Sequence, residues 1–110
     1  MPTLTYKILG QVAPLATTET LLYTVPAVTQ TVISSVTVTN RGSSATTFRV
    51  SVSAGGAATA TKDYLYFDVS IPANDTFIAT VGITMGTTDV VRVYGGNANL
   101  SCAVWGSEIT

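Results

Sequence analysis

The chain has 110 residues, enough for one domain with a single core and too few for two. The net charge is −1, the five basic residues are scattered and histidine is absent, which disfavours a nucleic-acid-binding protein and removes the commonest acid–base catalyst and metal ligand. The single cysteine excludes an intrachain disulfide, and neither a signal peptide nor a membrane-spanning segment is predicted.

Hydrophobic residues make up 46% of the chain and charged residues only 10%, well below the roughly 25% of ordinary globular domains. Threonine, valine and alanine dominate in place of leucine, glutamate and lysine. Because β-branched side chains lose little freedom on a pleated surface, this composition favours sheet. So few charges give weak protection against association, and we expect part of the surface to pack against other subunits.

The first predicted strand lies within residues 3–12 and alternates loosely between apolar and polar positions. Its apolar positions on one face are Leu4, Tyr6 and Ile8. Because Pro14 ends this alternation, the segment 1–18 is compatible with either an edge strand or an extended arm. A second short strand is predicted over 19–25.

The segment Thr31–Val52 is predicted to form a β-hairpin around which the rest of the chain is organised. Strands near 31–40 and 46–54 flank a polar loop whose residues tolerate left-handed backbone conformations. The side chains expected to point inward are Val32, Val36, Val38, Phe48, Val50 and Val52. Those expected to point outward are Ile33, Ser35, Thr37, Thr39, Arg49, Ser51 and Ser53.

The connection 54–63 is rich in small and polar residues and is predicted to be the most mobile surface segment. A strand over 64–71 follows, with Leu65, Phe67, Val69 and Ile71 expected inward and Tyr64, Tyr66 and Asp68 outward. Further strands are predicted over 76–84, 90–95 and 100–107. The first of these is expected to bury Phe77, Ala79, Val81 and Ile83.

Eight or nine short strands are therefore expected, with turn signals about every ten residues and no helical periodicity. This spacing predicts an all-β fold, an antiparallel β-sandwich of immunoglobulin-like or jelly-roll type. Residues 1–110 are expected to form it as a single domain.

No pattern of residues indicates a catalytic site, a cofactor or a metal, so we expect no enzyme. The aspartates lack calcium-loop spacing and are predicted to serve turns and the surface; they are Asp63, Asp68, Asp75 and Asp89. Cys102 shares the apolar face of the last strand with Leu100 and Val104 and is predicted to be a buried thiol without a base beside it.

Apolar and aromatic side chains on outward strand faces form a candidate contact surface, because exposed tyrosine and tryptophan often anchor interfaces. The candidates are Leu4, Tyr6, Ile8, Tyr64, Tyr66 and Trp105. The alternative is that the N-terminal segment simply covers this second face.

Five strand-and-turn segments cover nearly the whole chain: LGQVAP, LLYTVPA, VTVTNRGSSATTFRV, YLYFDVSIPANDTF and NANLSCAVWGSEIT. In these segments the chain resembles small virion structural proteins of tailed bacteriophages, particularly those of marine and cyanobacterial phages. The resemblance implies a non-enzymatic component of the virion, assembled in the cytoplasm of the host bacterium.

Under this resemblance the first expectation is a capsid decoration (cement) protein, a dimer or trimer that bridges major capsid subunits and stabilises the head. The N-terminal segment would then be an arm that adds a strand to a neighbour's sheet. The alternative is a tail, baseplate or fibre module that binds the host surface. A glycan would be a partner only in that case, stacked on Tyr64, Tyr66 or Trp105, and neither nucleic acid nor membrane is expected in either.

Overall fold

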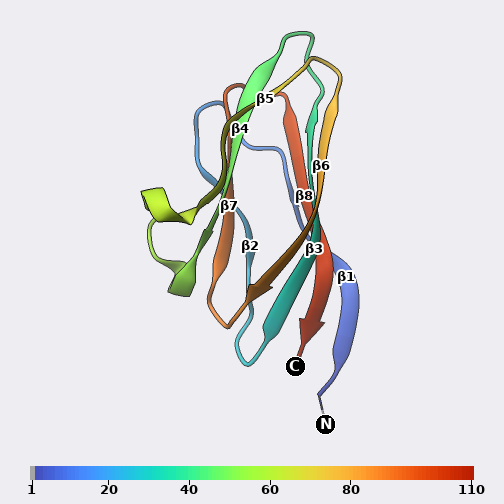
Figure 1. Cartoon of the computed structure of the whole chain (residues 1–110), viewed down its shortest axis with the longest axis vertical. Coiled ribbons are helices and arrows are strands. Elements are labelled where there is room, and N and C mark those ends of the chain that lie inside the picture. Colours follow the sequence, from blue (N-terminus) through green and yellow to red (C-terminus); the bar gives the residue numbers. More distant parts are fainter. Residues whose placement is uncertain (1) are drawn as a thin grey trace.

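A computed structural model that describes residues 2–110 shows eight strands in two antiparallel sheets packed face to face (Figure 1). Sheet A has the strand order β1 (Leu4–Val12), β8 (Leu100–Ile109), β3 (Gln30–Asn40), β6 (Thr76–Met85). Sheet B has the order β2 (Thr20–Thr24), β7 (Val90–Gly95), β4 (Thr46–Ser53), β5 (Tyr64–Ile71). The predicted antiparallel β-sandwich and the positions of its strands are confirmed.

Helical structure in the described chain is limited to two short 3-10 turns, η1 (Ala54–Gly56) and η2 (Thr61–Asp63), which lie in the connection between β4 and β5. Within residues 2–110, neither turn has the length or apolar character of a membrane-crossing helix.

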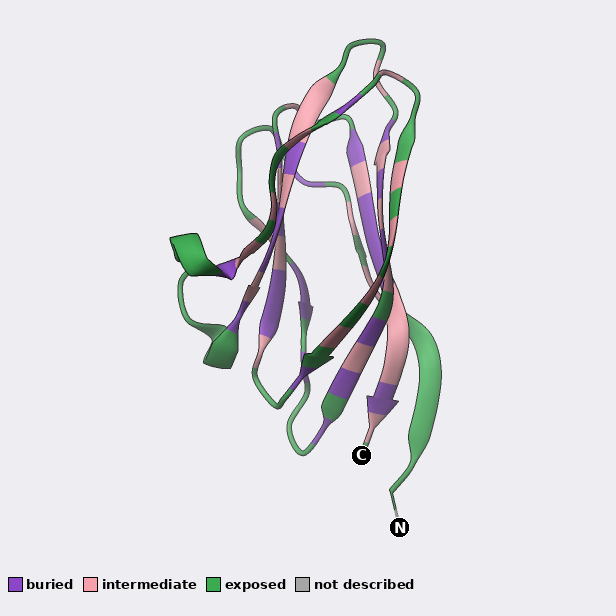
Figure 2. Cartoon of the chain, in the orientation of Figure 1, coloured by how far each residue is buried: buried purple, intermediate pink, exposed green. Residues whose placement is uncertain are grey.

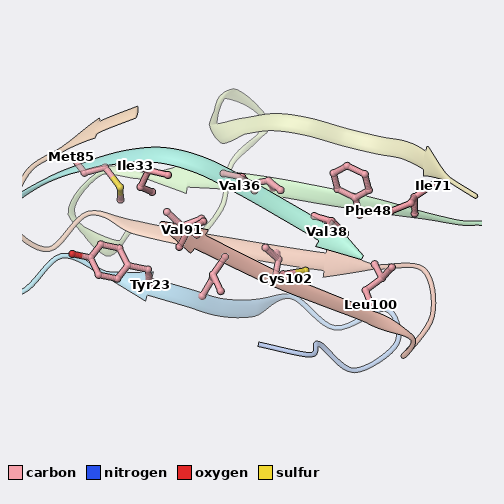
Figure 3. Close-up of a cluster of buried hydrophobic side chains, with 14 of the residues drawn as sticks. Tyr23, Ile33, Val36, Val38, Phe48, Ile71, Met85, Val91, Leu100 and Cys102 are labelled. Atoms are coloured by element: carbon pink, nitrogen blue, oxygen red, sulfur yellow. The ribbon is translucent and has the colours of Figure 1, made fainter. Parts of the chain in front are cut away.

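The core lies between the sheets and consists mainly of aliphatic side chains, with Phe48 and Tyr23 as its buried aromatic residues (Figure 3). Its fully buried members include Val25, Ile33, Val36, Val38, Phe48, Val50, Ile71, Val91, Val93, Leu100 and Val104. Cys102 is buried among them, as predicted, and burial raises the pKa of its thiol to about 12. The thiol is therefore a neutral packing group at physiological pH.

The predicted hairpin of β3 and β4 is wrong, because the two strands belong to different sheets. β3 pairs with β6 and β8, and β4 pairs with β5 and β7. The alternation in the sequence indicates only that each strand buries one of its faces. Two strands in facing sheets have this pattern, and so do two neighbouring strands of one sheet. The chain therefore crosses the sandwich between β3 and β4.

Asn40 holds the corner where the chain leaves sheet A. It is fully buried. Its Nδ2 donates to the carbonyls of Ser44, Ile71 and Pro72 at 2.9, 3.3 and 3.2 Å, and its Oδ1 accepts from the Gly42 N–H at 2.9 Å. The Asn40 amide thus bonds backbone groups of two segments at this end of the sandwich, the β3–β4 connection and the chain leading from β5 to β6.

A row of bulges crosses sheet A and reverses the facing predicted for the first half of β3. The register of β3 shifts between Ile33 and Ser35 against both of its neighbours. The inserted residue, Ser34, changes the phase of the alternation. Ile33, expected outward, is therefore fully buried, and Val32, expected inward, lies half-buried on the outer face.

Gly106 lies beside this row, in register with Ile33. A Cβ at position 106 would collide with the carbonyl of Val32, so the close approach of β8 to the bulge requires glycine. β1 carries a matching shift between Ile8 and Gly10, which keeps the bent strands in register with one another.

A second change of phase occurs in β5 at Asp68, whose φ of +51° is unusual for a non-glycine residue. Tyr66, expected outward, packs edge-on against Phe77 with ring centroids 5.0 Å apart at the margin of the core. Leu65 and Phe67, expected inward, are 46% and 55% exposed. The facing predicted for Leu65, Tyr66 and Phe67 is thus wrong because β5 is bulged, its register against β4 shifting twice.

The N-terminal segment forms an edge strand of sheet A. β1 pairs antiparallel with β8 from Leu4, opposite Ile109, to Val12, opposite Cys102. Beyond it, the backbones of Thr3 and Thr110 exchange two hydrogen bonds of 2.9 Å, so the two ends of the chain lie side by side (Figure 1). Of the two alternatives for residues 1–18, the edge strand describes residues 4–12.

Candidate interaction surfaces

The outer face of sheet A gathers apolar side chains from three neighbouring strands, exposed on β1 and half-buried on β8 and β3. We call this group the apolar face; its members are Leu4, Tyr6, Ile8, Val32 and Trp105. Leu4, Tyr6 and Ile8 are 49%, 79% and 52% exposed, and β1 is exposed along most of its length in Figure 2. Four of the six predicted contact residues therefore come together here.

Side chains of the apolar face line a shallow, open depression. Ile8 is in register with Trp105, and Tyr6 and Val32 line the same hollow. The rest of its lining is Lys7 and the small residues Ser34, Gly106 and Ser107. An open apolar hollow with few polar groups is better suited to a protein surface than to a small polar ligand.

A polar clip beneath the apolar face ties β1 to the other sheet. The Tyr23 hydroxyl of β2 donates to Glu108 Oε2 at 2.5 Å, and Thr31 Oγ1 lies 2.7 Å from the same hydroxyl oxygen. Lys7 Nζ of β1 pairs with Glu108 Oε1 at 2.9 Å. Glu108 is only 8% exposed, so the clip joins four strands around one buried carboxylate.

The ionisation of this clip follows from its geometry. The hydrogen bonds from Tyr23 and Lys7 lower the pKa of Glu108 below its ordinary value. Burial, reinforced by the bond to Glu108, raises the pKa of Tyr23 to about 12. At neutral pH the carboxylate is therefore charged and the phenol is a donor, which anchors β1 against the sandwich.

The outer face of sheet B places its aromatic rings around one arginine. The Arg49 guanidinium lies 4.2 Å from the ring centroid of Phe67 and 4.3 Å from that of Tyr94. Its Nε pairs with Asp68 at 2.7 Å, and this hydrogen bond raises the pKa of Arg49 further. Tyr64 packs edge-on against Phe67, with centroids 4.8 Å apart. These rings already have partners within the chain.

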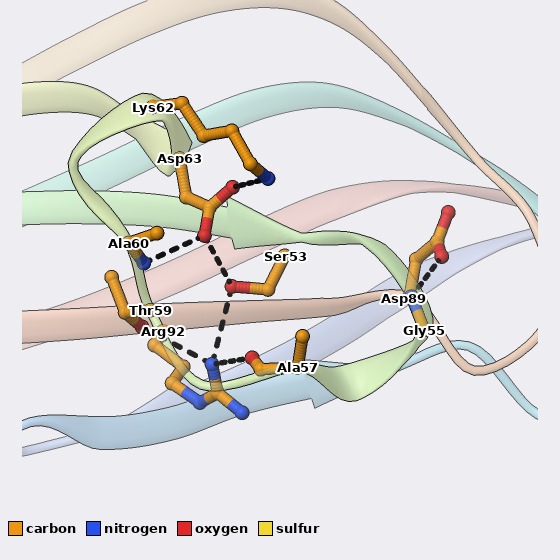
Figure 4. A network of polar contacts seen from close by, with 9 residues as sticks. All are labelled: Ser53, Gly55, Ala57, Thr59, Ala60, Lys62, Asp63, Asp89 and Arg92. Atoms are coloured by element: carbon orange, nitrogen blue, oxygen red, sulfur yellow. Dashed lines mark hydrogen bonds and ion pairs between the residues drawn. The ribbon is translucent and has the colours of Figure 1, made fainter.

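The connection 54–63 folds beside sheet B and is fixed by Arg92 (Figure 4). The Arg92 Nη1 donates to the Ala57 carbonyl at 2.8 Å and to the hydroxyls of Thr59 and Ser53 at 3.1 and 3.2 Å. The segment predicted to be most mobile therefore has a charged anchor at its centre, one that comes from a distant strand.

Aspartates fix the turns around this connection. The Asp63 carboxylate accepts from the Ala60 N–H at 2.8 Å, which lowers the pKa of Asp63, and the residue is buried where a surface position was expected. Asp89 accepts from the N–H groups of Gly55 and Gly86 at 2.8 and 2.9 Å. The turn role predicted for Asp89 agrees with these contacts.

The structure separates the predicted contact residues into two groups. Leu4, Tyr6, Ile8 and Trp105 share the apolar face, whereas Tyr64 and Tyr66 lie on sheet B, the first among the rings around Arg49 and the second at the core margin. Sequence reasoning missed Val32 on the apolar face, because no residue type in β3 signals the bulge. It also missed Ile78, which is 67% exposed on β6.

Comparison with known proteins shows a likeness of fold. No protein-family profile and no curated protein matches the sequence. A chain in the structure of infectious bursal disease virus, Gx strain, is similar with a TM-score of 0.55 and 13% sequence identity, over 99% of this chain and 32% of that one. This chain thus spans about a third of the length of the viral chain, and the likeness shows the fold alone.

Proposed function

We propose that this chain is a non-enzymatic structural subunit of a virus particle, and specifically a decoration (cement) protein on the capsid of a tailed bacteriophage. The observation that carries the proposal is the apolar face, which exposes Leu4, Tyr6 and Ile8 on a sheet held in place from behind. The fold shared with a chain of a virus and the resemblance to phage virion proteins support the same assignment.

The proposed mechanism is burial of the apolar face across the boundary between two major capsid subunits. Burying an exposed large apolar side chain contributes about 1.5–3 kcal/mol, so Tyr6 and Ile8 alone supply a large part of a specific affinity. The contacts among Lys7, Glu108 and Tyr23 hold β1 on the sandwich when the capsid subunits are under tension. Since β1 is already paired with β8, docking is proposed through its side chains and not through a free arm.

Location and copy number in the virion separate this function from the alternative, a tail, baseplate or fibre module. A decoration protein is expected at a copy number comparable to that of the major capsid protein, measured by quantitative mass spectrometry of purified virions. Antibody labelling in electron micrographs is expected on the head. Labelling confined to the tail, with few copies per particle, would reject decoration in favour of host-surface binding.

The apolar face is tested directly by the double substitution Tyr6→Ser with Ile8→Ser. The variant is added to particles that lack the protein, and binding is measured by co-sedimentation. We expect the affinity to fall by about a hundredfold, since two buried anchors are lost.

The matched control is Leu21→Ser with Leu65→Ser, two residues on sheet B that are 54% and 46% exposed. This control is expected to bind as the unaltered chain does. Equal losses in both variants, or unchanged binding of the Tyr6 and Ile8 variant, would show that docking does not use the apolar face.

A further inference from the structure

The two sheets leave four edge strands, and three of them carry features that discourage pairing with another chain. Natural sheets protect their edges with short strands, charged side chains and bulges. β1 carries Lys7, β2 has only five residues, and β5 has the bulge at Asp68 with its charge. The fourth edge, β6, has ten residues, TFIATVGITM, and none is charged.

The first half of β6 is a regular strand with one free side. Thr76 to Thr80 pair in unbroken register with Thr39 to Ser35 of β3, and the shift comes only after Thr80. Because β6 is the last strand of its sheet, the backbone groups on its other side pair with no strand in the part of the chain that the structure describes. Five regular residues are enough to template an added strand.

Both faces of β6 leave apolar surface uncovered at this edge. On the outer face, Ile78 is 67% exposed at the middle of the regular segment. On the inner face, Phe77 and Val81 pack against the core yet remain only half-buried, as do Tyr66 and Val69 of the facing edge strand β5. The alternation of exposed and half-buried residues along β6 is visible in Figure 2. A further strand beside β6 would cover these side chains.

We infer that β6 pairs with β6 of a second copy of this chain, antiparallel and about a two-fold axis at Ile78. An uncharged edge offers no charge for a charged partner to match, and it meets its own copy without like-charge repulsion. The two-fold places Ile78 beside its counterpart and Thr76 opposite Thr80, so the most exposed side chain of the strand becomes covered. Sheet A then continues from one copy into the other.

This inference goes beyond the proposed capsid role and does not depend on it. β6 and β1 are the opposite edges of sheet A, so the pairing edge and most of the apolar face are separated by β8 and β3. A paired molecule would present two apolar faces, one per copy, which suits the bridging of neighbouring subunits.

The test is sedimentation velocity of the full chain over a concentration series, with Ile78→Lys as the variant. The unaltered chain is expected to dimerise. The substitution puts two ammonium groups beside each other at the two-fold, and we expect it to weaken the dimer at least about a hundredfold. Leu21→Lys, at an exposed position on the edge strand β2, is the matched control and is expected to remain dimeric.

Hydrogen exchange supplies the second measurement. Amides of residues 76–80 are expected to gain protection as the concentration rises, and to lose that gain in Ile78→Lys. If Ile78→Lys does not fold, as judged by circular dichroism, Ile78→Glu replaces it with the same expectation, because it also sets two like charges beside each other at the two-fold.

Three results would overturn the inference. They are a chain that stays monomeric at every concentration, a dimer that survives the lysine at position 78, and a dimer that dissociates equally with lysine at position 21. The variant Tyr6→Ser with Ile8→Ser is expected to remain dimeric, so failure of capsid docking and failure of edge pairing give different results.

Discussion

The two outer faces of this sandwich both carry aromatic and aliphatic side chains but use them differently. On sheet B, Phe67 and Tyr94 hold Arg49 between them, and the connection 54–63 is fastened alongside by Arg92. On sheet A, Tyr6 and its neighbours on the apolar face remain exposed above a well-anchored strand.

What separates the faces is the presence of intramolecular partners for the rings of sheet B. Arg49 and the packing of Tyr64 on Phe67 make the aromatic rings of sheet B part of the monomer's own structure. Within residues 2–110 no such group covers Tyr6, whose side chain is 79% exposed. Substitutions on sheet B should therefore cost stability, and substitutions on the apolar face should cost binding.

The largest effect is expected at Asn40, because both faces are defined only while the two sheets keep their fixed relation. Asn40→Ala removes the donors to three carbonyls and the acceptor for one N–H in a fully buried corner. We expect a loss of about 3 kcal/mol in the free energy of unfolding, measured by urea denaturation.

Asn40→Asp keeps the size of the side chain but points a carboxylate at the three carbonyls, and it should destabilise at least as much. The control is Asn97→Ala, whose side chain makes a single bond in an exposed turn, to the Asn99 N–H. Similar stabilities for the Asn40 and Asn97 variants would mean that the corner does not hold the sheets together.

The second effect concerns the clip that makes the apolar face rigid. Glu108→Gln removes the charge that binds Lys7 and Tyr23. We expect the free energy of unfolding to fall by about 2 kcal/mol at neutral pH. The loss should be seen as a lower midpoint in urea at pH 7.

The sign of the pH dependence follows from the lowered pKa of Glu108. Its contribution is present above the ordinary carboxyl pKa and is lost as the pH falls from about 5 through the lowered value. The stability of the unaltered chain should therefore approach that of Glu108→Gln in acid. A constant difference between the two from pH 7 to the acid limit would contradict this assignment.

The strands themselves were predictable from the sequence, because alternation and turn residues are local signals that survive folding. The facing of the strands was not, wherever a bulge intervened. One inserted residue at Ser34 exchanged the roles of Val32 and Ile33, and one at Asp68 exchanged those of Tyr66 and Phe67. A bulge inserts a residue without a compositional mark, so the alternation continues in the sequence while its phase changes in space.

The candidate site was predictable in part for the same reason. Leu4, Tyr6 and Ile8 precede the bulge of β1, so their alternation places them correctly on one face. Which other strands lie beside them depends on the order β1-β8-β3-β6, a long-range property that local pattern does not contain. Trp105, on the neighbouring strand β8, therefore lies on the apolar face with Leu4, Tyr6 and Ile8, whereas Tyr64 lies on sheet B.

The third effect tests whether the connection beside sheet B is part of the fold. Arg92→Ala removes the donor to Ala57, Thr59 and Ser53. We expect the free energy of unfolding to fall by about 1–2 kcal/mol. Limited proteolysis, followed by mass spectrometry, should show new cleavage within 54–63. Arg41→Ala, whose bonds lie at the other end of the molecule, should leave this segment resistant.

The smallest expected effect comes from comparing one substitution on each outer face. Phe67→Ser removes a ring that contacts both Arg49 and Tyr64, and we expect the melting temperature to fall by roughly 4 °C. Tyr6→Ser removes a ring that is 79% exposed, and we expect the melting temperature to change by no more than about 2 °C. Binding to capsids should show the reverse order, with Tyr6→Ser impaired and Phe67→Ser unaffected. If Tyr6→Ser melted as far below the unaltered chain as Phe67→Ser does, the apolar face would be part of the monomer's own stability, as sheet B is.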